Sequence, residues 1–171
     1  MDSDDVKSWY VVQSKPQQEF VAVKNLERQG YRTYLPKISL SKRRGGKVVS
    51  QIEAMFPRYF FINLSSQTDN WGPIRSTIGV SGLVRFGLNP AKVPDFLIQG
   101  LVDGEDEAGV HVEAAREFTK GDKVRIVDGP FEGYEAIFKV KQASERALVL
   151  LNIAEQYANV KISGSSLEKF E

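Results

Sequence analysis

Residues 121–133, which read GDKVRIVDGPFEG, constrain the possible fold more than any other stretch of this chain. Polar and apolar side chains alternate over residues 123–127, as they do in a strand with one buried face. Gly129 and Gly133 allow backbone angles with φ above zero, so the segment predicts a strand, a tight turn and a second strand. Apolar runs at 135–140, 147–153 and 158–162 follow at about ten-residue spacing, which is typical of a small β-barrel.

The same region also contains a helical pattern. Ser144 is suited to cap a helix, and Leu148, Leu151 and Glu155 recur at helical spacing along one face. One stretch cannot be a strand and a helix at once, so residues 144–157 predict either barrel strands or a helix. The sequence leaves both structures open.

Charge divides the chain into three parts. Residues 1–98 carry 14 Lys and Arg against 8 Asp and Glu, residues 99–117 carry 1 against 6, and residues 118–171 carry 8 of each. The basic first part suggests a polyanionic partner. The acidic stretch 104–117, which includes His111, has no apolar periodicity and predicts a flexible linker.

The first part of the chain alternates strand and helix patterns. Strands are expected at 8–13, 31–35, 82–86 and after Pro57, and helices at 17–29, 94–102 and within 69–76. Gly30 is expected to cap the first helix, and a Gly45-Gly46 turn is expected to join two arms of a β-hairpin. Such an order predicts an α+β fold, an antiparallel sheet with helices packed on it.

Several classes of protein are excluded or disfavoured. The chain has no cysteine, which excludes disulfides and thiolate metal sites, and one histidine alone cannot build a histidine-rich metal site. Neither a signal peptide nor an apolar run of about 20 residues is present, so we expect a cytoplasmic protein without membrane contact. No carboxylate pair, nucleophile array or phosphate loop stands out, so we expect neither an enzyme nor a cofactor.

Several segments resemble one family. Residues 121–133 are similar to the KOW motif, and residues 9–13 (WYVVQ), 56–59 (FPRY) and 74–80 (IRSTIGV) resemble the N-terminal domain of NusG-type factors in order and spacing. Residues 26–29, 83–87, 131–138 and 148–152 look closer to the specialised RfaH branch. The NusG/RfaH resemblance implies a NusG-type domain at 1–103, an acidic linker at 104–117 and a KOW domain at 118–171. That last domain is expected to be a β-barrel, or a helical hairpin in an autoinhibited state.

The resemblance implies a monomeric transcription elongation and antitermination factor that binds the clamp helices of RNA polymerase and suppresses pausing. A small-subunit ribosomal protein is the implied partner of the C-terminal domain, coupling transcription to translation. Two alternatives stay open. One is a general NusG-like regulator with a permanent barrel tail, and the other is a KOW-type RNA-binding protein of the ribosome.

Site residues follow from the resemblance. For the polymerase clamp they are Phe56, Tyr59, Phe61, Phe86 and Ile98, although the residues alone favour an ordinary core. For the non-template DNA strand they are Lys15, Gln18, Asn25, Arg75 and Thr77, with Pro16, Val21 and Ile78 where the RfaH branch tends to be basic. For the opposite jaw of the polymerase they are Asn70, Trp71 and Gly72, where Trp71 could equally be a core anchor.

A third set of residues would join the two domains. Glu53 and Arg146 match positions that form an interdomain ion pair in RfaH-like proteins. An exposed ion pair contributes only about 0–1 kcal/mol, so apolar side chains must supply most of the cover. The expected cover residues are Phe131, Ile137, Phe138, Leu148 and Leu151. The hairpin tip, with Lys42, Arg43, Arg44 and Lys47, is either a nucleic-acid contact or a solvated basic turn.

Overall fold

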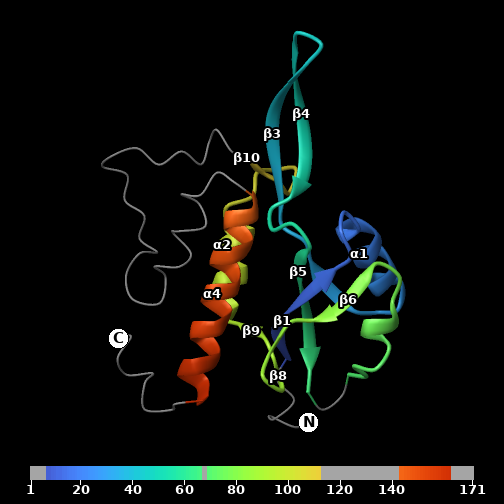
Figure 1. The fold of residues 1–171 in the computed structure, drawn as a ribbon, viewed down its shortest axis with the longest axis vertical. Helices are drawn as coiled ribbons and strands as arrows, with labels where there is room; N and C mark the ends of the chain where they lie inside the picture. The colour runs from blue at the N-terminus through green and yellow to red at the C-terminus, as the bar shows by residue number, and fades with distance from the viewer. Residues whose placement is uncertain (1–6, 67–68, 113–142, 163–171) are drawn as a thin grey trace.

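An antiparallel sheet lies at the centre of the protein, in the strand order β2-β5-β1-β6 (Figure 1). The computed structural model describes residues 7–66, 69–112 and 143–162. The strands of this sheet are β1 (Lys7–Ser14), β2 (Arg32–Tyr34), β5 (Tyr59–Ser65), β6 (Val80–Leu83) and β9 (Lys92–Val93), which also pairs with β1. In the register between β1 and β5, Val11 lies opposite Phe61 and Val12 opposite Phe60.

The side-chain alternation of β1 and β5 creates two apolar faces. Tyr10 and Val12 share one buried cluster with Phe60 and with Leu26 of helix α1 (Glu19–Arg28). On the other face, Trp9, Val11 and Phe61 share a cluster with α2 (Asp95–Asp103) and α4 (Ala143–Ile162). Figure 1 shows α1 on one side of the sheet and the pair α2 and α4 on the other. The predicted α+β sheet with packed helices is confirmed.

A long β-hairpin projects from the body of the protein (Figure 1). It consists of β3 (Lys37–Arg44) and β4 (Lys47–Ala54). Gly45 and Gly46 turn the chain with φ of 58° and 79°, in the region that favours glycine. The hairpin and its turn agree with the sequence prediction, and Arg43, Arg44 and Lys47 are exposed near the tip.

Some boundaries differ from those expected. The predicted strand 82–86 is split into β6 and β7 (Arg85–Phe86), and β7 pairs with β8 (Asn89–Pro90). The backbone between them turns aside at Val84, whose amide donates to Val11 and whose carbonyl accepts from Ala91. Within 69–76 the structure has a single 3₁₀ turn, η1 (Ile74–Ser76). Gly30 follows α1 with φ of 94°, as expected for a helix end.

The first nine residues of the predicted linker are ordered, contrary to the expectation of a flexible segment. Asp106 accepts backbone hydrogen bonds from Ala108 and Val110 through Oδ1, which closes a turn. Strand β10 (His111–Val112) then pairs in parallel with β3, and His111 is fully buried. In a sequence, acidic residues that close a turn cannot be told apart from the solvated acidic residues of a linker. Apolar periodicity therefore did not predict this turn.

The C-terminal part contains a helix where the sequence allowed a helix or strands. Helix α4 covers residues 143–162, slightly more than the predicted 144–157. The motif at 121–133 lies outside the described residues. Within the described residues, no helix is both long and apolar enough to cross a membrane.

Candidate functional site

The five residues expected to bind the polymerase clamp meet in one apolar cluster. Phe56, Phe61 and Ile98 are buried in it, while Tyr59 and Phe86 pack at its edge and are half-buried. The rings of Phe56 and Phe61 meet edge to face, with centroids 6.1 Å apart. We call these five residues the apolar patch.

A strained turn between β4 and β5 positions the patch. Arg58 has φ of 73°, a conformation that costs a non-glycine residue about 1–3 kcal/mol and must be held by its surroundings. Its amide donates to Glu19 Oε2 at 2.8 Å and its Nε to the Ser14 carbonyl at 3.1 Å. The Tyr59 amide donates to the Phe56 carbonyl, so the turn brings both aromatic side chains into the patch.

Helix α4 lies against this patch. Ala147, Leu150 and Ala154 are buried at spacings of three and four residues, and Leu150 and Ala154 belong to the same cluster as the patch. Val149 and Ile153 pack beside them. These spacings define the buried face of the helix, which differs from the face of Leu148, Leu151 and Glu155 expected from the sequence.

The predicted orientation of α4 is wrong in one respect. Leu148 was expected to cover the patch, but its side chain is 62% exposed. The helix instead buries the face that carries Ala147, Leu150 and Ala154. Phe131, Ile137 and Phe138, the other expected cover residues, lie outside the described residues, and Leu151 is half-buried.

Arg146 joins the start of α4 to the turn between β4 and β5. Its side chain is only 2% exposed, and its Nε donates to the carbonyl of Met55 at 2.9 Å. Met55 is the neighbour of Phe56, so this bond joins the helix to the edge of the patch. The sequence pointed to Arg146 but not to the Met55 carbonyl; the expected ion pair with Glu53 stays a prediction.

Tyr157 lies near the other end of the same helix. Burial and then the Asp95 carboxylate, in the first turn of α2, raise the pKa of its phenol above the ordinary value of 10.0. A raised pKa means that the contact favours the neutral phenol. The contribution of the neutral Tyr157 phenol to the stability of the folded state is therefore complete at neutral pH. It is lost as pH rises through the raised pKa of this phenol.

The residues expected to contact DNA surround the junction of β1, α1 and η1. Lys15 and Arg75 are exposed, and Gln18 and Asn25 are half-buried. Thr77 differs, because it is buried, donates to the Pro73 carbonyl and accepts from Gln29 Nε2 at 2.8 Å. Thr77 therefore braces the loop from within.

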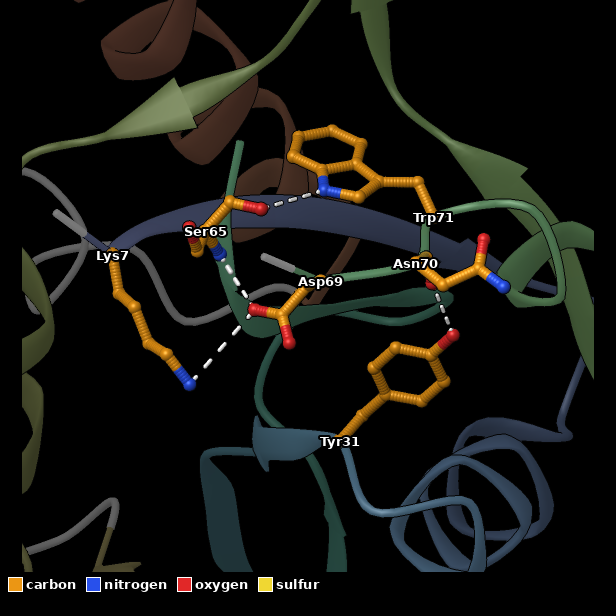
Figure 2. A network of polar contacts seen from close by, with 6 residues as sticks. All are labelled: Lys7, Tyr31, Ser65, Asp69, Asn70 and Trp71. Atoms are coloured by element: carbon orange, nitrogen blue, oxygen red, sulfur yellow. Dashed lines mark hydrogen bonds and ion pairs between the residues drawn. The ribbon is translucent and has the colours of Figure 1, made fainter. Parts of the chain in front are cut away.

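The loop expected to reach the opposite jaw is held by several hydrogen bonds (Figure 2). Trp71 Nε1 donates to the Ser65 carbonyl at 2.9 Å, and the indole packs edge to face on Tyr10 at 4.8 Å. Asp69 accepts from the Ser65 amide at 2.7 Å and lies 3.8 Å from Lys7 Nζ. Trp71 thus acts as an anchor, and of the three residues expected to reach the opposite jaw, Asn70 and Gly72 are exposed.

Tyr31, which directly precedes β2, adds a further hydrogen bond to the same loop. Its hydroxyl donates to the Asn70 carbonyl at 2.5 Å (Figure 2). Burial and then Asp69 raise the pKa of the Tyr31 phenol above its ordinary value of 10.0. The hydrogen bonds of Tyr31, Asp69 and Trp71 thus hold the loop in one position.

Replacing Trp71 with phenylalanine is expected to lower the free energy of unfolding by about 1–2 kcal/mol, because the Ser65 carbonyl loses its donor while an aromatic ring remains on Tyr10. Chemical denaturation measures the loss. Ser66→Ala, at an exposed neighbour, is the control and should change the value by less than about 0.5 kcal/mol. Equal effects of the two substitutions would contradict the anchoring role.

Comparisons with known proteins agree on one family. A family model described as "Transcription termination factor nusG" matches residues 7–102. The chain is 27% identical to the transcription termination/antitermination protein NusG of Thermus thermophilus, covering 94% of this chain and 97% of that one. It is 24% identical to the protein of that name from Escherichia coli K12, covering 95% and 96%, and 24% identical to that from Bacillus subtilis, covering 95% and 98%.

Among solved structures, one described as "Domain interaction in Thermotoga maritima NusG" aligns with a TM-score of 0.44 at 21% identity, covering 58% of each chain. The family model covers more than half of this chain, including the whole central sheet, the hairpin and α1. The chain therefore belongs to the NusG family of transcription termination/antitermination factors, which act without being enzymes.

Proposed function

We propose that this chain is an elongation and antitermination factor of the RfaH kind, and that α4 covers its polymerase-binding face at rest. The apolar patch binds the clamp helices of RNA polymerase. The observation that carries the proposal is the burial of Leu150 and Ala154 in the same cluster as the patch residues. A face that accepts one amphipathic helix has the shape and chemistry to accept another.

The contact also implies competition. Clamp helices and α4 cannot both occupy the patch, so binding requires α4 to leave. If the open form is a small fraction of the molecules, the apparent affinity for the clamp falls by that same fraction. The cover thereby restricts the factor to sites where another contact helps to recruit it.

The remaining proposed contacts are those that the NusG/RfaH resemblance implies. Lys15, Gln18 and Arg75 would contact the non-template DNA strand near the body of the polymerase. Asn70 and Gly72 would reach the opposite jaw, held in place by Trp71. A closed clamp bridged in this way resists the opening that accompanies pausing, and residues 118–171 would recruit a small-subunit ribosomal protein after release.

A general NusG-like regulator with a permanent barrel tail is the second candidate. Its barrel would need strands at 147–153 and 158–162, whereas both segments lie inside α4. The helix favours the covered form. Membership of the NusG family likewise favours a polymerase factor over a ribosomal RNA-binding protein.

Replacing Arg146 with methionine tests the proposal. Methionine keeps most of the volume but leaves the Met55 carbonyl without its donor, which costs about 1–3 kcal/mol and weakens the docking of α4. We expect affinity of the full chain for a polymerase clamp coiled-coil fragment to rise by about five- to a hundredfold. Titration calorimetry measures the change.

Arg28→Met is the matched control, because Arg28 is exposed at the end of α1, and it should leave the affinity unchanged. If the Arg146 variant binds no better than the wild type, α4 is not a cover. If neither protein binds the clamp fragment at all, the proposed role of the patch is wrong.

A further inference from the structure

Strand β4 carries exposed apolar side chains along an edge of the hairpin sheet. The strand order of this sheet is β10-β3-β4, so within the described residues no strand lies on the outer side of β4. Val48 is 65% exposed and Ile52 is 53% exposed, and both lie outside the two buried clusters. An apolar edge strand of eight residues is a surface on which another strand can pair.

The outward hydrogen-bonding groups of β4 belong to the same residues. Facing residues of an antiparallel pair alternate between those that exchange hydrogen bonds and those that do not. Met55 directly follows β4 in the same register, and its amide donates to the Pro36 carbonyl at 2.9 Å, so the odd-numbered residues of β4 bond to β3. The even-numbered residues Val48, Ser50 and Ile52 therefore direct their amides and carbonyls outward.

The sequence of β4 is complementary to itself in the antiparallel direction. When Ser50 faces Ser50 of a second copy, Val48 of each copy faces Ile52 of the other. These pairs use the outward backbone groups of both strands, as a hydrogen-bonded ladder requires. Facing β-branched apolar side chains stabilise a strand pair. A slide by two residues, the smallest that keeps the outward groups paired, separates Val48 from Ile52 in both copies.

The charges of the hairpin agree with this register. On the reverse face of β4, Lys47 of each copy lies opposite Glu53 of the other, and opposite charges that face each other across a ladder are favourable. The basic tips, with exposed Arg43 and Arg44, lie towards opposite ends of the paired strands. Six residues along the ladder separate the two copies of Lys47 by about 20 Å, which exceeds the Debye length of about 8 Å at physiological ionic strength.

We propose that two copies of this chain pair through their β4 edges, which joins the two hairpin sheets across a two-fold axis at Ser50. The contact is isologous, because each copy uses the same surface. One pair of short strands is smaller than a standard interface, so we expect a weak dimer with a dissociation constant of about 100 μM. The monomer that the family resemblance implies is the form at lower concentration. The β4 edge does not include the apolar patch, so this proposal and the proposed clamp contact can fail independently.

The first test is sedimentation equilibrium of the full chain over concentrations that span this dissociation constant. The mean mass of the wild type should rise from that of a monomer towards that of a dimer. Ile52→Lys places a charge opposite Val48 twice in each dimer and should weaken association by about tenfold or more. Leu88→Lys, at a leucine that is 92% exposed outside the hairpin, is the matched control and should leave association unchanged. A monomer at every concentration, or equal effects of the two substitutions, overturns the proposal.

Single cysteines test the register, because the chain has no cysteine of its own. In the proposed register the two Ser50 Cα atoms lie about 5.5 Å apart, within the range of about 4.4–6.8 Å that a disulfide spans. Ser41 faces Ser50 on β3, so the two copies of Ser41 lie about 14 Å apart, three strand spacings. Ser50→Cys should therefore form covalent dimers on mild oxidation, and Ser41→Cys should not. Equal crosslinking of the two variants overturns the pairing of β4 edges even if the chain is dimeric.

Discussion

Replacing Leu150 with aspartate is expected to release α4 from the sheet and to raise affinity for the polymerase clamp fragment by more than about a hundredfold. Leu150 is fully buried between the helix and the apolar patch. Burying a carboxylate there costs at least about 3 kcal/mol, which exceeds what a single helix contact can recover. The affinity is measured by titration calorimetry, and helix content by far-UV circular dichroism.

Leu148→Asp is the matched control. It places the same charge, with the same helix propensity, on the side of α4 that is exposed. The control should change neither clamp affinity nor the helical signal appreciably. If Leu150→Asp and Leu148→Asp behave alike, the packing of α4 on the patch does not govern access. A loss of helical signal in the Leu150 variant alone would also indicate that α4 owes its stability to the patch.

The second large effect concerns Gly79 and the opposite face of the sheet. Gly79→Ala is expected to lower the free energy of unfolding by about 2–5 kcal/mol for two reasons. At φ of 92°, an alanine costs about 1–2 kcal/mol. Its Cβ would also lie 2.8 Å from the Ala22 nitrogen and 3.0 Å from the Ala22 Cα, so α1 must move, at a further cost of about 1–3 kcal/mol.

Gly30→Ala separates the two terms. Gly30 has a nearly identical φ of 94°, but no atom lies within 4 Å of the position of the added Cβ. It should lose only the conformational part, about 1–2 kcal/mol. Urea denaturation at unchanged m-value gives both numbers. Equal losses at the two sites would show that α1 and the loop before β6 are not in tight contact.

A movement of α1 would also change the surface that we propose to contact DNA. Asn25 links α1 to the Ile78 carbonyl, and the Lys15 amide donates to the Gly79 carbonyl. The close approach at Gly79 therefore sets the spacing between α1 and the loop before β6. No single one of these residues signals that role in the sequence.

Local patterns were sufficient to predict much of the N-terminal fold. Alternation in β1 separates Trp9 and Val11 from Tyr10 and Val12, and the structure buries these pairs on opposite faces. The Gly45-Gly46 turn between two apolar arms likewise predicted the hairpin. Both signals depend on residues that are near one another in the chain, so no knowledge of distant contacts was needed.

The acidic stretch after α2 illustrates the opposite case. Asp106 accepts two backbone hydrogen bonds and Glu105 accepts one from the Tyr34 hydroxyl, so these acids close a turn and attach it to β2. Strand β10 pairs with β3, more than 70 residues earlier in the chain. A pairing at that distance leaves no periodic trace in so short a segment.

By itself, the sequence determined the antiparallel sheet and the two apolar faces of its strands, because both follow from short-range periodicity. The residues of the apolar patch came from the family resemblance, since periodicity alone favoured an ordinary core. The sequence did not determine the structure of residues 143–162, for which strand and helix patterns competed. Only the tertiary structure decided that these residues form a helix and which face of the helix is buried. Tertiary packing of an apolar face supplies most of the stability of a helix in a protein, and α4 packs Leu150 and Ala154 into the cluster that contains the apolar patch.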